Sequence, residues 1–249
     1  MNTLAFRTLG ASAVLVVGLA GCGGPAAETA AKSTGDSSSA AAKPATPTPT
    51  PTSAKTYSGE ELAAMIGQLK DAKGAKLAVM SSADLSGSVA QAKSLLSSMT
   101  VEPAECQEMA LSGTAPSIEG ATAAMGTSLD AAAGASTSVS MTSGLDPAFL
   151  AKTMAQAGEV TKCGKMSFTV AGVKADATLT PIDGVGSVPG TLGYQTDTIM
   201  STGQKQSIIT AQAVSHGVLL TVIAMGGTSK EEAVARTGAM LDQAASLLK

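Results

Sequence analysis

The chain has very few aromatic residues, no tryptophan and little charge. Aromatic residues make up 2% and charged residues 14% of its 249 positions, with one histidine and three cysteines. Scarce aromatic rings argue against a site that stacks sugars or bases. The net charge of -3 argues against a general nucleic-acid binder, so we expect no nucleic-acid partner. Apolar runs of about 20 residues do not recur, which excludes a polytopic membrane protein.

The first 22 residues have the pattern of a bacterial lipoprotein signal. Arg7 gives a positive start, residues 8–19 form a mostly apolar stretch too short to span a bilayer comfortably, and Leu-Ala-Gly-Cys follows, ending at Cys22. This tetrapeptide resembles the lipobox, in which cleavage leaves a cysteine that carries diacylglycerol. We therefore expect residues 1–21 to be a signal peptide and Cys22 to be the lipid attachment site. The lipid would anchor the protein to the membrane, on the outer face of the plasma membrane in the cell envelope. A plain secretory signal and a signal anchor are the alternatives.

Residues 22–56 have the composition of a stalk. They are rich in Ala, Ser, Thr and Pro and almost lack large apolar side chains, so they cannot bury enough surface to fold. Alternating Thr and Pro over residues 46–52 favours extended polyproline II and is typical of O-glycosylated segments. We expect a disordered spacer that is followed by one folded domain, residues 57–249.

The folded domain changes from helical spacing to a period of two along its length. Helices are expected after the capping box at Ser58, over 85–99, from Pro103, from the Asp-Pro pair at 146–147 to Gly158, and after a second capping box that begins at Thr228. The expected strands are 76–81, 135–142, 165–173, 174–181, 191–200, 205–215 and 217–225. Residues 117–126 match neither pattern. Short turns between successive strands imply antiparallel pairing, and strand 217–225, apolar on both faces, should be central. The predicted fold class is α+β, a mostly antiparallel sheet of about five to six strands with helices packed on it.

Two thiols remain in the folded domain, Cys106 and Cys163. Outside the membrane an even pair of cysteines is typical of a disulfide, which would close a loop of about 57 residues. Metal binding is the alternative, but two thiols without a nearby histidine make a poor site. We expect the disulfide and no metal.

Three motifs resemble those of a known family. Glu61 to Gly67 resembles its opening amphipathic helix, Pro103 to Cys106 is similar to its Pro-Glu-Cys helix start, and Phe149 to Gly164 looks like the helix whose end carries the partner cysteine. The family is the extracellular sensor domain of the actinobacterial PknH receptor serine/threonine kinase and its stand-alone lipoprotein relatives. The resemblance implies a sensor domain that binds an unidentified ligand in a cleft. The chain lacks the second disulfide and the aromatic residue that the family usually has near its C-terminal strands.

The residue types used in catalysis form no convincing constellation. His216 is expected at a hairpin tip, and Ser215 beside it would face the other side of the strand, so the pair predicts no dyad. The glycine-rich segment 184–190 lacks the lysine of a phosphate loop. Arg236 stands alone on the last helix, and the adjacent acids at 231–232 suit a first helical turn. We expect a protein that is not an enzyme and holds no cofactor.

A ligand site, if the sheet has one, is predicted where apolar and hydrogen-bonding residues mix. Tyr194 and Gln212 lie on neighbouring expected strands, and both are predicted to project into a cleft between sheet and helices. A half-solvated sheet face would have the same pattern. The function we expect is a noncatalytic, sensor-like domain that binds a small molecule, a lipid or an envelope partner. The alternative is a lipid or glycolipid carrier with an apolar cavity, which the many methionines would suit.

Overall fold

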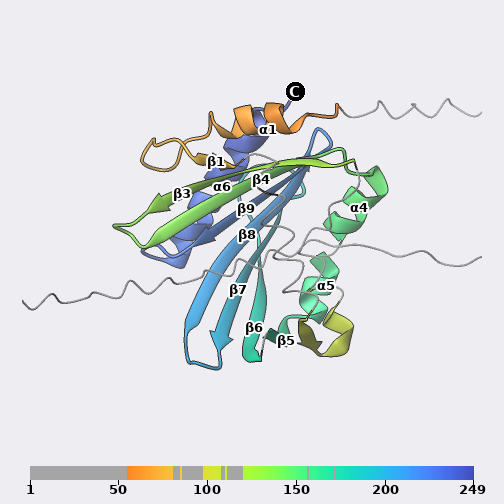
Figure 1. Cartoon of the computed structure of the whole chain (residues 1–249), viewed down its shortest axis with the longest axis vertical. Coiled ribbons are helices and arrows are strands. Elements are labelled where there is room, and N and C mark those ends of the chain that lie inside the picture. The colour runs from red at the N-terminus through yellow and green to blue at the C-terminus, as the bar shows by residue number, and fades with distance from the viewer. Residues whose placement is uncertain are drawn as a thin grey trace, which may run out of the picture.

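A computed structural model describes residues 55–80, 85, 98–107, 110, 120–155, 157–170 and 172–249. One antiparallel sheet dominates it, with nine strands in the order β1-β3-β4-β9-β8-β7-β6-β5-β2 (Figure 1). The strands are β1 (Ala78–Met80), β2 (Thr100–Glu102), β3 (Thr122–Asp130), β4 (Ala135–Ser143), β5 (Lys165–Val170), β6 (Val173–Ile182), β7 (Leu192–Met200), β8 (Lys205–Ser215) and β9 (Val218–Met225). The described helices are α1 (Gly59–Ile66), η1 (Ala104–Cys106), α4 (Pro147–Ala155), α5 (Ala157–Lys162) and α6 (Lys230–Ser246).

The predicted fold class is wrong, because the sheet is much larger than five to six strands and most of the described helices are short. Among the described helices only α6 exceeds nine residues. Seven individual strands were expected from the sequence, and the two that were missed are β3 and β2. Strand β3 includes residues left unassigned from the sequence, and its Ala, Gly, Ser and Thr side chains give a weak hydrophobic alternation. Strand β2 has three residues, too few for any periodicity to appear.

Tight packing explains why β3 is built of small residues. Gly126 of β3 lies directly under helix α1, where an added Cβ would come within 2.3 Å of Ile66 Cγ2 and 3.2 Å of Leu77. Only glycine lets the helix approach the strand this closely. The residue that weakens the strand pattern in the sequence is therefore the one that packing with α1 requires.

The later strands agree closely with the expectation. Strand β4 alternates strictly between buried and half-buried residues, and β8 has the predicted bounds of 205–215. Strand β9 pairs with β4 on one side and β8 on the other, which confirms its central position. Strands β1 and β2 occupy the two opposite edges of the sheet, although β1 is the nearest described strand before β2 in the chain.

The helix ends are set by the predicted caps, with two corrections. Ser58 and Glu61 form the reciprocal capping box of α1, and Asp146 Oδ1 accepts the backbone N–H of Ala148 at 2.8 Å before α4. Helix α6 is capped by Ser229, one residue later than expected, because the Ser229 hydroxyl accepts the N–H of Glu232 at 3.2 Å. Gly158 does not end a helix, since it lies within α5. Most of the helix predicted over 85–99 lies outside the described residues.

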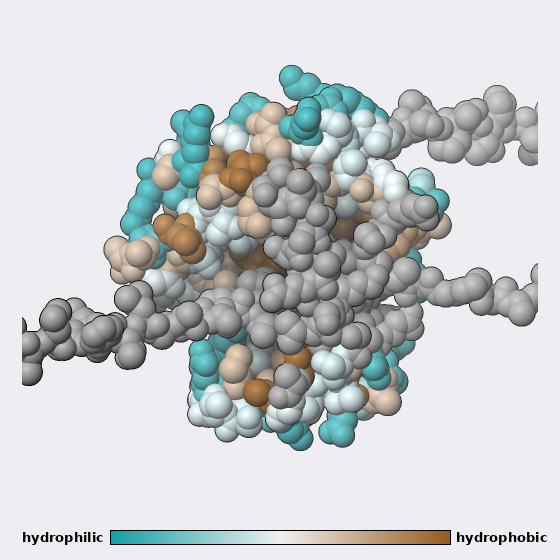
Figure 2. All heavy atoms as spheres, viewed as in Figure 1, coloured by the Kyte–Doolittle hydropathy of each residue, from teal (hydrophilic) through white to brown (hydrophobic). Residues whose placement is uncertain are grey.

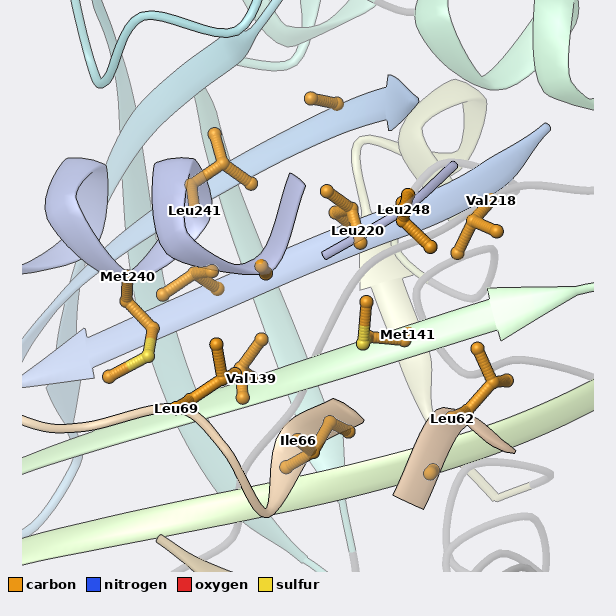
Figure 3. Close-up of a cluster of buried hydrophobic side chains, with 14 of the residues drawn as sticks. Leu62, Ile66, Leu69, Val139, Met141, Val218, Leu220, Met240, Leu241 and Leu248 are labelled. Atoms are coloured by element: carbon orange, nitrogen blue, oxygen red, sulfur yellow. The ribbon is translucent and has the colours of Figure 1, made fainter. Parts of the chain in front are cut away.

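Helices α1 and α6 cover one face of the sheet, which we call the first face. Their apolar side chains interlock with those of β4, β8 and β9 in the main core (Figure 3). Leu62 and Ile66 come from α1, Leu241 from α6, and Val139 and Leu220 from the sheet, and all five are fully buried. Burial of one such side chain contributes about 1.5–3 kcal/mol. These contacts place α6 against the middle of the sheet.

A second, smaller core lies on the opposite face, which we call the second face, near β2, β5 and β6. It contains Met166, Leu179 and the predicted disulfide, which joins Cys106 after β2 to Cys163 at the end of α5. The disulfide is thus confirmed. Helix α4 covers another part of this face through Leu150, which packs near Leu219 of β9. On the parts of this side that Figure 2 colours, apolar side chains form small separate patches among hydrophilic and neutral ones.

Candidate functional site

Tyr194 and Gln212 lie together on the second face of the sheet. The strand register pairs Tyr194 with Thr210 and Gln212 with Leu192, which makes the two side chains diagonal neighbours. Both are buried, at 7% and 6% exposure. Burial raises the pKa of Tyr194 to about 12, although a hydrogen bond with Thr210 opposes the shift. Gln212 Nε2 donates to Thr221 Oγ1 at 3.4 Å. Contact of these two side chains with a ligand stays a prediction.

Ser215 and His216 are closer than the sequence predicted. The hydroxyl of Ser215 lies 3.1 Å from His216 Nδ1, because His216 leaves the strand at a positive φ of 51° in the turn between β8 and β9. Ser215 and His216 therefore do not face opposite sides of the strand, as neighbouring strand residues would. The imidazole is exposed, and within the described part of the chain no carboxylate bonds to it, so the pair lacks the third member of a catalytic triad.

The glycine-rich segment 184–190 is a structural loop between β6 and β7. Val185 is buried in the main core, and the N–H of Ser187 donates to the carboxylate of Asp242 at 2.7 Å. Gly186 packs against Gly238 of α6, where a Cβ added to Gly238 would lie 2.6 Å from Gly186 N. Helix α6 packs against this part of the loop, and its Asp242 carboxylate already accepts the loop N–H group. A phosphate or other anion would be repelled by this carboxylate, so the loop is not an anion site.

A pocket of about 230 Å³, lined by charged side chains and by small apolar ones, lies at one end of the first face, and the sequence did not predict it. Its floor is the start of β4, including Ala135 and Thr137. One wall is the loop that follows α1 together with the end of β3, and the other wall is the first two turns of α6. The walls stand apart because α1 packs over β3 and α6 over β8 and β9, which leaves β4 between them. Gln243 of α6 also bonds both backbone groups of Lys70, which ties the loop to the helix.

The loop wall contains one acid that shapes the loop and one ion pair. Asp71 accepts the hydroxyl of Ser128 at 2.7 Å and the N–H groups of Lys73 and Ala75 at 2.9 Å each. These bonds, that of Ser128 first, lower the pKa of Asp71. Lys73 Nζ lies 2.7 Å from Asp130 Oδ2, and this contact is the main cause of a lowered pKa at Asp130. The Lys73 side chain is 64% exposed, so its ammonium group reaches solvent.

The helix wall contains an incompletely bonded ion pair. Arg236 Nη1 lies 3.4 Å from Glu232 Oε1, which is longer than the 2.7–2.9 Å of a good charge-assisted hydrogen bond. Arg236 Nη2 donates to the carbonyl oxygens of Met225 and Gly226, at 3.3 and 3.1 Å. The Arg236 side chain is only 10% exposed. Its Nε and the Glu232 Oε2 are buried without a hydrogen-bond partner. Such atoms are uncommon in folded proteins and often mark functional sites.

Close approach of two turns brings the pocket residues together. A Cβ added to Gly226, after β9, would lie 2.0 Å from the carbonyl oxygen of Gly134 in the β3–β4 turn. Gly227 has φ of 104° and lies against the Glu232 carboxylate. Both positions require glycine, because a side chain at φ between +60° and +104° would also be strained. The Gly-Gly pair at 226–227 is the one local signal in the sequence that could have indicated a tight approach here.

The chemistry open to this pocket is recognition by charge and hydrogen bonding. Among the described residues, no group of three His, Cys, Asp or Glu side chains is placed to hold a metal ion. None of the described helices is long and apolar enough to cross a membrane.

The predicted lipid attachment site, Cys22, and nearly all of the expected stalk lie outside the described residues.

The fold and the pocket define an antiparallel-sheet domain with a small charged recess at one end. Neither a protein-family model nor a curated protein sequence matches the chain. Among solved structures it is similar to the extracellular domain of PknH from Mycobacterium tuberculosis, with a TM-score of 0.47 and 13% identity over 78% of this chain and 97% of that one. It is also similar to an Rv0999 ortholog from Mycobacterium smegmatis, with a TM-score of 0.39 and 14% identity over 60% of this chain and 76% of that one.

Proposed function

We propose that this chain is a cell-envelope lipoprotein whose folded domain binds a small polar ligand without catalysing a reaction. The observation that carries the proposal is the pocket beside α6, where Glu232 Oε2 and Arg236 Nε are buried without partners. Both atoms lie beneath the surface of the pocket, so a ligand that supplies one acceptor and one donor would complete these bonds only after the two side chains turn toward it. Each such bond to a charged group contributes about 1.5–3 kcal/mol.

The same pocket favours a polar ligand over the lipid of a carrier protein. Its walls hold Asp71, Lys73, Asp130, Glu232 and Arg236, which an acyl chain would have to desolvate. The main core between the sheet and α1 and α6 is filled by interlocking side chains, Met141 and Met240 among them (Figure 3). In these places methionine fills a core and does not line a cavity.

In a lipid-anchored protein, the pocket would lie at the end of β3 and β4 opposite to the point where the stalk joins the domain. The folded domain begins at Tyr57, whose N–H donates to Ser143 Oγ at 2.9 Å and whose carbonyl accepts the hydroxyl of Thr122 at 2.6 Å. Thr122 begins β3 and Ser143 ends β4, whereas Asp130 and Ala135 in the pocket lie at the other ends of these strands. Nine residues of strand span about 30 Å. The stalk therefore joins the domain about 30 Å from the pocket, at the opposite end of the two strands.

Cell fractionation tests the anchor. In the wild-type protein we expect the membrane fraction to hold the chain, and in Cys22→Ala we expect release into the soluble fraction, because the diacylglycerol attachment site is gone. Ser53→Ala, a change in the same expected stalk, serves as the control and should stay membrane-bound. If Cys22→Ala remains in the washed membranes, the lipobox interpretation is wrong.

Native mass spectrometry tests the binding function. The protein purified from its native envelope in mild detergent should carry a small polar molecule, which Glu232→Gln should lose. Glu231→Gln is the matched control, because this neighbouring acid is exposed and does not line the pocket. A copurified acyl lipid retained by both variants would favour the carrier instead. Wild-type protein free of any bound molecule, from several extractions, would contradict binding altogether.

A further inference from the structure

The charged side chains of the pocket are arranged as two opposed ion pairs. Asp71 is taken up by Ser128 and by its own loop, so it contributes to the loop and not to a ligand. The remaining groups are Lys73 with Asp130 on the loop wall and Glu232 with Arg236 on the helix wall. Each wall thus presents one positive and one negative group across the floor formed by β4.

This arrangement fits neither a simple anion nor a simple cation. An anion that approached Arg236 or Lys73 would lie beside Glu232 or Asp130, and like charges at close range repel. A cation that approached Glu232 or Asp130 would likewise be repelled by the neighbouring Arg236 or Lys73. A ligand with one positive and one negative group can satisfy both walls at once, with a carboxylate toward the basic groups and an ammonium toward the acids.

The two unpartnered atoms also need ligand groups of opposite kinds, one acceptor and one donor. Arg236 Nε needs an acceptor and Glu232 Oε2 needs a donor, and both are buried, so a ligand reaches them only when the two side chains turn toward the pocket. The 3.4 Å separation of Arg236 Nη1 and Glu232 Oε1 is long for an ion pair. Little interaction energy is therefore lost when a ligand replaces the contact between these two side chains. Lys73, with its exposed side chain, can follow the ligand in the same way.

We propose that the pocket binds a small zwitterion, a free amino acid or the equivalent amine-carboxylate end of a larger molecule. This rests on the proposed binding function and names its ligand class. The volume of about 230 Å³ equals roughly seven or eight water molecules at 30 Å³ each, which admits an amino acid.

Isothermal titration calorimetry with three matched probes tests the ligand class. The full chain, purified from bacterial membranes in mild detergent, is titrated with L-alanine, with N-acetyl-L-alanine, which lacks the positive charge, and with L-alaninamide, which lacks the negative one. We expect L-alanine to bind with a Kd of about 1 mM or tighter, and each blocked probe to bind at least about tenfold more weakly, because each loses one charged hydrogen bond.

Two pairs of variants locate the binding. Glu232→Gln and Lys73→Met should weaken L-alanine binding by about tenfold or more. Their controls, Glu231→Gln and Lys76→Met, change exposed neighbours that do not line the pocket and should bind as the wild type does. Equal thermal melting of each variant and its control separates lost binding from lost folding.

The outcomes are distinct for the ligand class and for the binding function. Tighter binding of either blocked probe than of L-alanine would overturn the zwitterion and indicate a singly charged ligand. If none of the three probes binds, the zwitterion is likewise overturned. The pocket as a binding site would still stand if an envelope extract raised the melting temperature of the wild type and not that of Glu232→Gln.

Discussion

The two cores of this domain are stabilised in different ways. Among the described residues, eighteen buried side chains form the main core under α1 and α6, whereas eight form the core near β2, β5 and β6, and two of these eight are the bonded cysteines. A small cluster buries less apolar surface, so it contributes less to stability. A covalent bond between distant segments compensates by restricting the unfolded chain. The disulfide therefore lies in the smaller of these two cores.

Among the changes that test the difference between the two cores, removal of the disulfide should lower the free energy of unfolding the most. Cys106→Ala combined with Cys163→Ala should lower the free energy of unfolding by about 4 kcal/mol, the chain-entropy value for a loop of 57 residues. Urea unfolding measures the total. Hydrogen exchange should show the loss of protection mainly in β2 and β5. Equal loss of protection in β4 and β9 would mean that the two cores unfold as one unit.

A cavity in the main core should have the next largest effect. Leu241→Ala removes a fully buried side chain of α6 and should cost about 3 kcal/mol, since truncation of buried leucine costs 2–5 kcal/mol. Leu129→Ala is the control, because this side chain is 77% exposed and the change should stay within about 0.5 kcal/mol. Chemical denaturation of both variants checks the difference. Similar losses in the two would show that the core is not the source.

A backbone clash at the pocket end should follow. Gly226→Ala should cost about 2 kcal/mol, because φ is +63° and the new Cβ would lie 2.0 Å from Gly134 O. Gly203→Ala is strained by a similar φ of +84° but meets nothing within 4 Å, so it should cost about 1 kcal/mol. The difference in melting temperature between the two variants isolates the close approach of the turns. No difference would mean that the turns can separate freely.

The smallest effect expected is the response of the pocket end to acid. Asp71 and Asp130 have lowered pKa values, so their contribution to stability is fully present above the unfolded pKa of about 3.9. It is lost as the pH falls through the lower folded values, because the native state then has to bind protons that the unfolded state already holds. Asp71→Asn should make the melting temperature fall less steeply below about pH 4. Asp183→Asn, which lies outside the pocket, is the control and should leave the slope unchanged.

Local patterns predicted the individual elements well and the size of the sheet poorly. Strand β4 was evident because its alternation is strict, and α1 was evident because Ser58 and Glu61 form a cap within four residues. Strand β3 was missed since Gly126 and its small neighbours are chosen by their contact with α1, which no periodicity records. The number of strands therefore could not be counted from the sequence.

Local sequence patterns predicted the pocket even less well than the number of strands. Asp71, Asp130 and Glu232 are each explained locally as loop, turn or first-turn residues, and Arg236 stands alone on its helix, so no local pattern links the four. Tyr194 and Gln212 could be placed on one face because adjacent strands and alternation suffice for that inference. The pocket needs residues from three separate segments, so its existence depends on which strands pair.

The sequence by itself determined the caps, the turns, the later strands, the cysteine pair and the pattern of a lipid anchor. Each of these depends on residues close together in the chain or, for the cysteines, on there being no other partner in the folded domain. Only the tertiary structure decided that β1 and β2 lie at opposite edges, and that α1 and α6 leave the start of β4 open between them. The reason is physical: periodicity specifies which face of an element is buried, whereas the element that buries it is chosen by packing across the whole sheet.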